Sequence, residues 1–259
     1  MFGMERLQAI RETLYENGSV EVVTLSKMLS VSEMTIRRDL DKLEKEGLVV
    51  KTYGGAILKK DVNDENAALE KDNKNKLHSK IAKIASELVE DQEVIFIGGS
   101  SILLELSNYL KSKNGLVVVT NNINVAMNII SYKTVKVIIT AGEIDPATGD
   151  IFGYETIHSL DNILIEKAFI SVDGIDSDLG YTTNNKEYLE LYQVLRKISN
   201  RVILVAEHKQ YGKRGLKRIA QLDDIKEVVA DKNIPDMFKE YYFNNDIRLY
   251  ASVVDMDQF

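Results

Sequence analysis

The residues best suited to chemistry are polar and basic side chains on one predicted helix near the start of this 259-residue chain. Within Val31–Leu43, Thr35, Arg38 and Lys42 recur at helical spacing, and Arg37 lies at the edge of the same face. Basic side chains on one face of a helix suit contact with a polyanion such as DNA, whose major groove admits a helix. The alternative is that this basic pair belongs to a solvated face, as most such pairs do.

The elements predicted around this helix would place it in a helix-turn-helix. The N-cap Ser32 should start it and Gly47 should end it. Its apolar residues fall at i, i+4 and i+7 and must face a core: Ile36, Leu40 and Leu43. Earlier helices are predicted at Glu5–Tyr15 and around Leu25–Leu29, and a tight turn joins the second helix to the third.

A β-hairpin is predicted directly after the third helix. Leu48–Tyr53 and Ala56–Leu58 are extended runs on either side of Gly54-Gly55. A hairpin in this place is the wing of a winged helix-turn-helix. The capped helix, the tight turn and the hairpin together favour a DNA-binding unit over a solvated face.

The charge distribution is compatible with this function. The net charge of −7 argues weakly against binding to a polyanion, but residues 1–60 hold ten basic and nine acidic residues. The acidity therefore lies in the larger remaining segment. The chain has no cysteine, which excludes disulfides and thiolate metal sites, and no apolar run reaches the roughly 20 residues that span a bilayer. Its first residues lack the apolar stretch of a signal peptide, so we expect no such peptide and a cytoplasmic protein.

The residues Thr35-Ile36-Arg37-Arg38-Asp39-Leu40, followed by Leu43-Glu44-x-x-Gly47 and Gly54-Gly55-Ala56, resemble the signature of the DeoR family of bacterial transcriptional regulators. The resemblance covers residues 4–58, with Tyr53 where the family usually has histidine. It implies DNA contacts from Ser32, Thr35, Arg37, Arg38, Lys42, Lys51, Thr52, Tyr53, Gly54 and Gly55. The helix residues would neutralise phosphates or contact guanine edges, and the wing would lie on the backbone or in the minor groove. Asp39 would orient a neighbouring arginine.

The rest of the chain is predicted to form a second, larger domain. Residues 59–76 are polar and should be a linker, partly helical at Glu65–Asp72. From residue 77 to 235, apolar runs alternate with amphipathic helices, which predicts a mostly parallel α/β sheet covered on both faces. The predicted strands are Val94–Ile97, Leu116–Val119, Val135–Ile139, Ala168–Val172 and Arg201–Val205. Residues 236–259 form an aromatic-rich tail that should pack on this domain, with an oligomer interface as the alternative.

The loop Gly98-Gly99-Ser100-Ser101, between a strand and a helix, is the best candidate anion site. Glycines let backbone N–H groups approach a ligand, serines donate hydrogen bonds, and the helix N-terminus favours negative charge. No Gly-Lys-Ser/Thr follows, so the loop is not a P-loop. Ordinary turn chemistry is the alternative.

This segment is similar to the sugar-phosphate-sensing domain of the same family, which is related in fold to ribose-5-phosphate isomerases. The resemblance covers about residues 77–232 and implies that a phosphorylated sugar or related metabolite controls DNA binding. The implied effector-binding residues are Gly98, Gly99, Ser100, Ser101, Thr120, Asn121, Asp173, Gly174, Glu207, Lys209 and Gln210. Several charged positions depart from the family, including Ile97 for an aspartate and Gln210 for a lysine. These departures imply either an atypical ligand or weak ligand binding.

Three functions remain open on the sequence. The first is a metabolite-responsive regulator, usually a repressor, that acts as a dimer or tetramer on double-stranded operator DNA. The second is a repressor with a degenerate pocket. The third is an isomerase-like enzyme with Asp176 as base, although Ser177 stands where such enzymes have a glutamate. We expect no enzyme activity, no cofactor and no metal, and structural or solvated roles for His78, His158 and His208.

Overall fold

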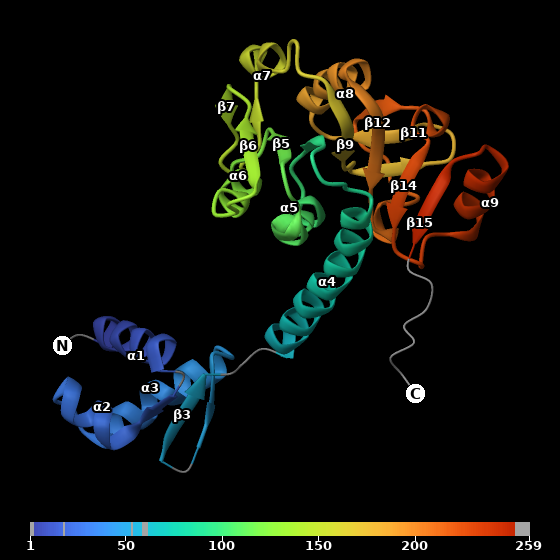
Figure 1. Ribbon diagram of the computed structural model, residues 1–259. Coiled ribbons are helices and arrows are strands. Elements are labelled where there is room, and N and C mark those ends of the chain that lie inside the picture. The colour runs from blue at the N-terminus through green and yellow to red at the C-terminus, as the bar shows by residue number, and fades with distance from the viewer. Residues whose placement is uncertain (1–2, 18, 53, 59–61, 252–259) are drawn as a thin grey trace. The chain divides into compact units, whose positions relative to one another are not determined.

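The computed structural model describes residues 3–17, 19–52, 54–58 and 62–251 and divides into two units, Met1–Asp72 and Asn73–Phe259 (Figure 1). Tyr53, a predicted wing contact, lies outside the described residues. Across the described ranges, no helix has both the length and the apolar character needed to cross a membrane.

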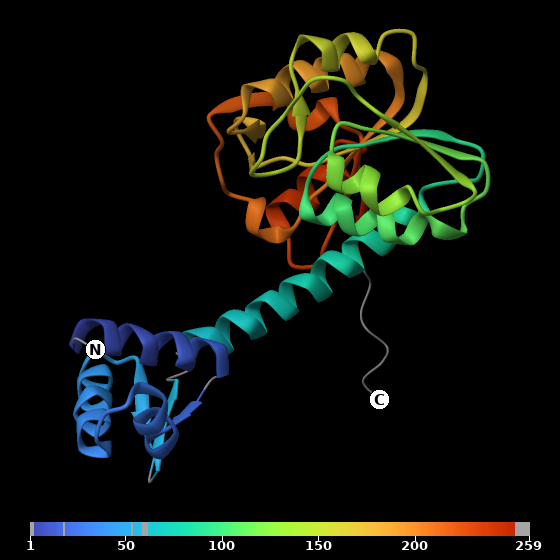
Figure 2. The same cartoon turned by 90° about the vertical axis from the view of Figure 1, so that its left-hand side faces the viewer.

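The first unit is a winged helix-turn-helix, as predicted (Figure 2). Its elements are α1 (Gly3–Asn17), β1 (Ser19–Glu21), α2 (Val22–Leu29), α3 (Glu33–Lys45), β2 (Val49–Lys51) and β3 (Gly55–Leu58). β2 and β3 form the predicted antiparallel hairpin, and β1 joins the other edge of β3. The predicted core face of α3 is buried against α1 and α2, through Ile10, Leu14, Leu25, Ile36, Leu40 and Leu43.

Helix α4 (Val62–Glu87) replaces most of the predicted linker. Residues 62–76 of the predicted linker, which we expected to be helical only at Glu65–Asp72, all belong to this helix, and the division between the two units falls among them. The sequence of this helix contains no glycine or proline, and its C-terminal part packs into the second unit through Ile81, Ala82 and Ala85. Propagation from an anchored helix explains why a polar segment without a core of its own is helical.

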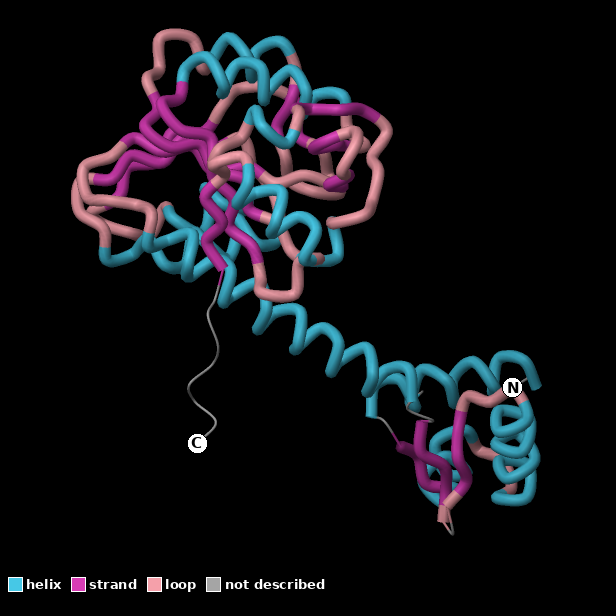
Figure 3. Tube along the Cα trace, turned by 90° about the vertical axis from the view of Figure 1, so that its right-hand side faces the viewer, coloured by secondary structure: helices cyan, strands magenta, loops and turns pink. Residues whose placement is uncertain are grey.

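The second unit is built on a seven-stranded sheet in which every neighbouring pair is parallel. Figure 3 shows the strands of this unit in magenta and its helices in cyan. The strand order is β15-β14-β12-β9-β4-β5-β6. The strands are β4 (Val94–Ile97), β5 (Leu116–Thr120), β6 (Val135–Ile139), β9 (Ile165–Ile170), β12 (Ser199–Val205), β14 (Glu227–Ala230) and β15 (Arg248–Ala251). The helices are α5 (Ser101–Asn108), α6 (Ile123–Ile129), α7 (Tyr154–Ser159), α8 (Lys186–Ile198) and α9 (Asp236–Asn244). This confirms the predicted α/β sheet.

The described residues of this unit also form two smaller sheets and three short 3₁₀ turns. β7 (Glu143–Ile144) pairs with β8 (Ile151–Phe152), and β11 (Gly180–Thr183) lies between β10 (Gly174–Asp176) and β13 (Lys217–Ala220). The 3₁₀ turns are Tyr109–Ser112, His208–Gln210 and Leu222–Asp224.

Alternating side chains of the central strands divide between two cores. In β4, Ile95 and Ile97 pack with α4, α5 and α6, whereas Phe96 packs with α8 and α9 on the opposite face. The segment predicted as a tail belongs to this architecture, because Phe238 and Tyr242 of α9 are buried and β15 is a strand of the sheet. The predicted packing of the aromatic residues on their own domain is confirmed for Phe238 and Tyr242 but not for Phe243, which is exposed.

Candidate nucleic-acid interface and effector pocket

The turn between α2 and α3 fixes the start of the candidate DNA helix. Ser30 takes a left-handed conformation, with φ of 54°, and ends α2. The Ser26 hydroxyl donates to the Val31 carbonyl at 2.6 Å, which ties the turn to α2. The Ser32 side chain accepts from the Thr35 backbone N–H at 3.2 Å, as predicted for an N-cap, and the two hydroxyls lie 2.9 Å apart.

The basic side chains predicted to contact DNA lie exposed on α3, opposite its buried apolar face. Arg38 has no ion-pair partner within the described part of the chain. Arg37 is half exposed and reaches Glu33 only at 4.0 Å, and Lys42 contacts Asp39 at 3.5 Å. The structure thus brings three cations, Ser32 and Thr35 to one helix and its N-terminus.

Asp39 has a different partner from the one expected. It is 1 % exposed and accepts from the Arg6 Nε of α1 at 2.6 Å as well as from Lys42. The arginine that Asp39 orients is therefore Arg6, which joins α1 to α3, and not Arg37 or Arg38. This carboxylate therefore stabilises the packing of α3 against α1 and does not belong to the exposed face.

The wing residues predicted to contact DNA differ in their exposure and in their partners. Lys51 contacts Asp41 of α3 at 2.5 Å and Glu44 at 3.4 Å, so it links the wing to the helix. Thr52 and Gly54 are exposed, whereas Gly55 is buried. A Cβ on Gly55 would lie 1.9 Å from the Val20 carbonyl oxygen, so close packing against β1 accounts for this glycine.

In the second unit, a cavity lies where the strand order of the sheet reverses. β5 and β6 follow β4 to one side, while β9, β12, β14 and β15 extend to the other. The loops after β4 and β9 flank this switch point, which is the usual ligand position in open α/β sheets. The cavity has a volume of about 610 Å³ and is lined by Gly99, Ser100, Ser101, Leu104, Asn122, Asn124, Asp145, Thr148, Asp150, Asp173, Asn184, Asn185 and Tyr188. We call it the switch-point pocket.

The predicted loop forms one wall of this pocket. Ser100 is the N-cap of α5 and accepts from the Leu103 N–H at 3.1 Å, and Gly99, Ser101 and Asp173 also line the cavity. Asp173 accepts from the Thr183 hydroxyl at 3.0 Å and from the Asn184 N–H at 2.7 Å. Four of the predicted effector residues are thus brought together.

The deepest polar contacts of the pocket involve residues that the sequence did not single out. Asp150 is buried and accepts from Asn122 Nδ2 at 2.8 Å and from the Tyr188 hydroxyl at 2.7 Å. Burial, and then the nearby Asp150, raises the pKa of Tyr188 far above its ordinary value, so this hydroxyl stays protonated. Asn122 follows the predicted residues Thr120 and Asn121 directly, whereas Asp150 and Tyr188 are brought to the pocket by tertiary packing.

Several predicted effector residues serve the scaffold instead. Thr120 is buried and donates to the Ile97 carbonyl at 2.6 Å, and Asn121 is buried and donates to the Ile151 carbonyl at 3.2 Å. A Cβ on Gly174 would lie 2.5 Å from the Lys213 carbonyl oxygen. Gly98 donates its N–H to Phe169 at 3.0 Å and lies outside the pocket wall. These positions hold strands and loops together.

The last predicted group, Glu207, Lys209 and Gln210, also lies away from the pocket wall. Gln210 donates to the Val172 carbonyl and accepts from the Glu207 N–H, so its side chain braces two loops. Glu207 Oε2 lies 3.6 Å from Nε2 of the buried His78 in α4. Lys209 is exposed.

The other two histidines and Asp176 are also engaged by neighbours. Asp231 and Asp161 are the partners of His208 and His158, at 3.1 and 2.9 Å. Asp176, the base of the enzyme alternative, accepts from Arg214 Nε at 2.6 Å, and that contact, followed by hydrogen bonds from backbone N–H groups, lowers its pKa. It does not line the switch-point pocket.

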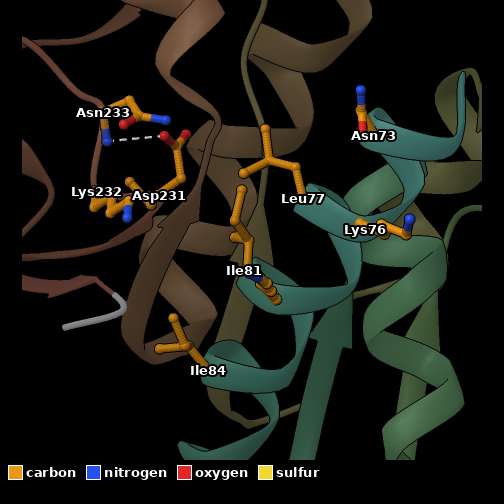
Figure 4. Close-up of a pocket in the computed structure, with 10 residues that line it drawn as sticks. Asn73, Lys76, Leu77, Ile81, Ile84, Asp231, Lys232 and Asn233 are labelled. Carbon is orange, nitrogen blue, oxygen red and sulfur yellow. Dashed lines mark hydrogen bonds between the residues drawn. The ribbon is translucent and has the colours of Figure 1, made fainter. Parts of the chain in front are cut away.

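A second cavity, of about 290 Å³, lies between α4 and the loop after β14 (Figure 4). Leu77, Ile81 and Ile84 of α4 face it, and Asp231 accepts from the Asn233 N–H at 2.9 Å on the opposite side. None of the predicted effector residues lines it. Among the described residues, no group of three or more histidine and carboxylate side chains is arranged to hold a metal.

Each of the two units matches a known family of domains. Residues 6–62 match the DeoR-like helix-turn-helix domain, and residues 73–232 match the DeoR C terminal sensor domain. A putative aga operon transcriptional repressor of Escherichia coli O157:H7 is 28 % identical over 239 residues, which cover 89 % of this chain and 87 % of that protein. The transcriptional repressor GlcR of Bacillus subtilis is 26 % identical over 258 residues, with 98 % of both chains covered.

Solved structures show more distant similarity. The sorbitol operon regulator SorC of Klebsiella pneumoniae covers 93 % of this chain and 99 % of its own, at 11 % identity and a TM-score of 0.41. Ribose 5-phosphate isomerase of Plasmodium falciparum covers 55 % of each chain, at 15 % identity and a TM-score of 0.39.

Proposed function

This chain belongs to the DeoR family of transcriptional regulators, and from that premise we propose that it binds a specific operator sequence in double-stranded DNA as a repressor of a carbohydrate-metabolism operon. The relatives that share most of its length are named as transcriptional regulators and repressors, which supports this assignment.

One observation carries the DNA-binding part of the proposal. A helix capped by Ser32 presents Arg37, Arg38 and Lys42 to solvent while its opposite face is buried in the core of the unit. Guanidinium and ammonium groups on such a helix can neutralise phosphates and donate to guanine O6 and N7 in the major groove. The wing residues Lys51 and Thr52 would add backbone contacts.

We further propose that a phosphorylated sugar or related metabolite controls this binding from the switch-point pocket. The position of the cavity at the strand ends and its polar lining support a small hydrophilic ligand. The protein would act as a homodimer or tetramer, because operators of such proteins carry paired half-sites.

Two alternatives are less well supported. A repressor with a degenerate pocket would have the same DNA-binding unit, and only ligand binding separates it from the main proposal. An isomerase-like activity would need a positioned carboxylate base, and Asp176 is held by Arg214 outside the pocket.

The decisive experiment measures operator binding with and without metabolites. We expect the full-length protein to shift a duplex carrying its own promoter in a gel assay, with an affinity that falls steeply as salt rises. A sugar or sugar phosphate that raises the thermal midpoint of the protein should also change this affinity, since a ligand that binds one state preferentially shifts the equilibrium. Absence of any shift at low salt would refute the proposal.

A further inference from the structure

A carboxylate of the chain itself lies against the candidate anion loop. A Cβ built on Gly99 would lie 1.6 Å from Oδ1 of Asp150 and 2.7 Å from Nδ2 of Asn122. The Asp150 carboxylate therefore packs directly against the Gly99 backbone, and only glycine leaves room for it. Asp150 is 3 % exposed, so this is a buried and fixed position.

Both carboxylate oxygens of Asp150 are bound by donors of the pocket. Asn122 Nδ2 donates to Oδ1 at 2.8 Å and the Tyr188 hydroxyl donates to Oδ2 at 2.7 Å. The Tyr188 hydroxyl also lies 3.1 Å from the Gly99 carbonyl oxygen, so it is held between loop and carboxylate. A phosphate in this place would compete with Asp150 for the same two donors.

The remaining lining adds negative charge and no positive charge. Asp145, Asp150 and Asp173 face the cavity together with four asparagines, and no lysine or arginine is among the described residues that line it. A phosphate dianion beside Asp150 would meet a like charge in a partly desolvated site. Hydroxyl groups, by contrast, donate to carboxylates and accept from asparagine side chains.

We propose that Asp150 is a specificity-determining residue that lies against Gly99 and keeps a phosphate away from the Gly98–Ser101 loop. The pocket then takes a polyhydroxylated carbohydrate whose hydroxyl groups face Asp150 and Gly99, and any phosphate group of the ligand lies away from this loop. The inference rests on the proposed effector role of the switch-point pocket. It reverses the orientation expected from the sequence, in which the loop holds the phosphate.

The test uses full-length protein and inorganic phosphate, with ionic strength held constant. Asp150→Ser removes the carboxylate and leaves the Asn122 and Tyr188 donors facing the vacated place. We expect this variant to bind phosphate at least about tenfold more tightly than wild type, because the like charge is gone. The readouts are calorimetric titration and the rise of the thermal midpoint with phosphate concentration.

Asp145→Ser is the matched control. It removes one carboxylate from the same pocket but leaves Asp150 against Gly99, so we expect no gain in phosphate binding. Equal gains in both variants would show a general charge effect and overturn the proposal. Phosphate binding by wild type that is as tight as in Asp150→Ser would also overturn it.

Two further measurements keep the outcome decisive. If Asp150→Ser is too unstable to study, wild type alone is tested with unphosphorylated pentoses, hexoses and hexitols beside inorganic phosphate. Stabilisation by one of the free carbohydrates and not by phosphate supports the proposal, and the opposite result refutes it. Gel shifts on the same preparations report the proposed DNA-binding function separately, so failure of one is distinguishable from failure of the other.

Discussion

Arg38 is the side chain on which operator recognition should depend most directly. It is exposed on α3 and has no ion-pair partner within the described residues, so its guanidinium is available to a base edge or a phosphate. We expect Arg38→Ala to weaken operator binding by about 1–3 kcal/mol in a titrated gel shift. Arg38→Lys keeps the charge but loses the bidentate geometry, and an intermediate loss would indicate contact with guanine. Wild-type affinity in both variants would contradict the placement of this helix in the groove.

Replacement of Asp41 should strengthen operator binding, in contrast to replacement of Arg38. It holds Lys51 of the wing at 2.5 Å, and the contact with Lys51 lowers the pKa of Asp41, so the pair is charged at neutral pH. Because Asp41→Asn removes a carboxylate beside the proposed DNA surface and releases Lys51, we expect operator affinity to rise by roughly two- to fivefold at low salt. The gain should vanish in high salt, since exposed charges are screened. Reduced affinity at low salt would show that the Lys51–Asp41 contact orients the wing for binding.

At this scale the sequence predicted the exposed polar face of α3 better than the lining of the switch-point pocket. The helix cap, the polar face and the basic pair of α3 all follow from local sequence spacing. The exposed face of this helix was therefore predictable from the sequence, with residues Ser32, Thr35, Arg37, Arg38 and Lys42. Asp150 and Tyr188 could not, because residues 150 and 188 meet Gly99 only through packing across the switch point. Thr120 and Asn121 occupy the expected strand end but face inward.

At the scale of elements, the packing of β1 against β3 can be tested with two adjacent glycines, Gly54 and Gly55. A Cβ on Gly55 would meet the Val20 carbonyl at 1.9 Å, whereas a Cβ on Gly54 would have no heavy atom within 4 Å. We expect Gly55→Ala to destabilise the first unit by about 1–3 kcal/mol because β1 must move away from β3. Gly54→Ala should leave the unfolding free energy nearly unchanged. Denaturant unfolding followed by circular dichroism measures both, and equal losses would contradict the close approach.

The contact between α4 and the loop after β12 should make stability depend on pH. Burial lowers the pKa of His78, although Glu207 opposes this, with Lys74 and Lys209 also nearby. A lowered folded-state pKa means that the unfolded chain binds the proton more readily. The stability that His78 contributes is therefore present above its ordinary pKa of about 6.5 and is lost as pH falls towards the folded-state pKa.

We test this with His78→Gln and a matched exposed histidine. Between pH 7.5 and pH 5.5, the wild-type thermal midpoint should fall more steeply than that of His78→Gln, because the variant has no imidazole to protonate. His158→Gln, which removes an exposed histidine of the same unit, should follow wild type. Parallel curves for wild type and His78→Gln would contradict the assignment.

The elements themselves were largely predictable, and the exceptions have physical causes. Apolar runs bounded by glycine and asparagine correctly predicted the central strands, because buried parallel strands are apolar throughout. The full length of α4 was not predicted. Residues 62–76 lack apolar periodicity and are helical by extension of a packed segment. β15 was not predicted as a strand, because Arg248–Ala251 is short and only its pairing with β14 reveals it.

At the scale of the whole molecule, the charge balance argues for paired binding. Residues 1–60 carry ten basic and nine acidic side chains, and the remainder is acidic, so a single DNA-binding unit offers only a few cations to the phosphates. Affinity in such proteins comes from two units on two half-sites spaced by whole helical turns of about 10 base pairs. We expect destruction of one half-site to weaken binding by about 100-fold or more, because several base contacts are lost at about 1–3 kcal/mol each.

The distance between the two half-sites distinguishes binding by two units of one oligomer from two independent binding events. Insertion of about 5 base pairs between the half-sites places them on opposite faces of the duplex, whereas about 10 base pairs restore the same face. If two units of one oligomer bind together, the shorter insertion should weaken binding more than the longer one, in a titrated gel shift at fixed salt. Equal affinity for single, paired and respaced sites would show that one unit suffices. Operator specificity would then have to come from α3 and the wing of a single chain.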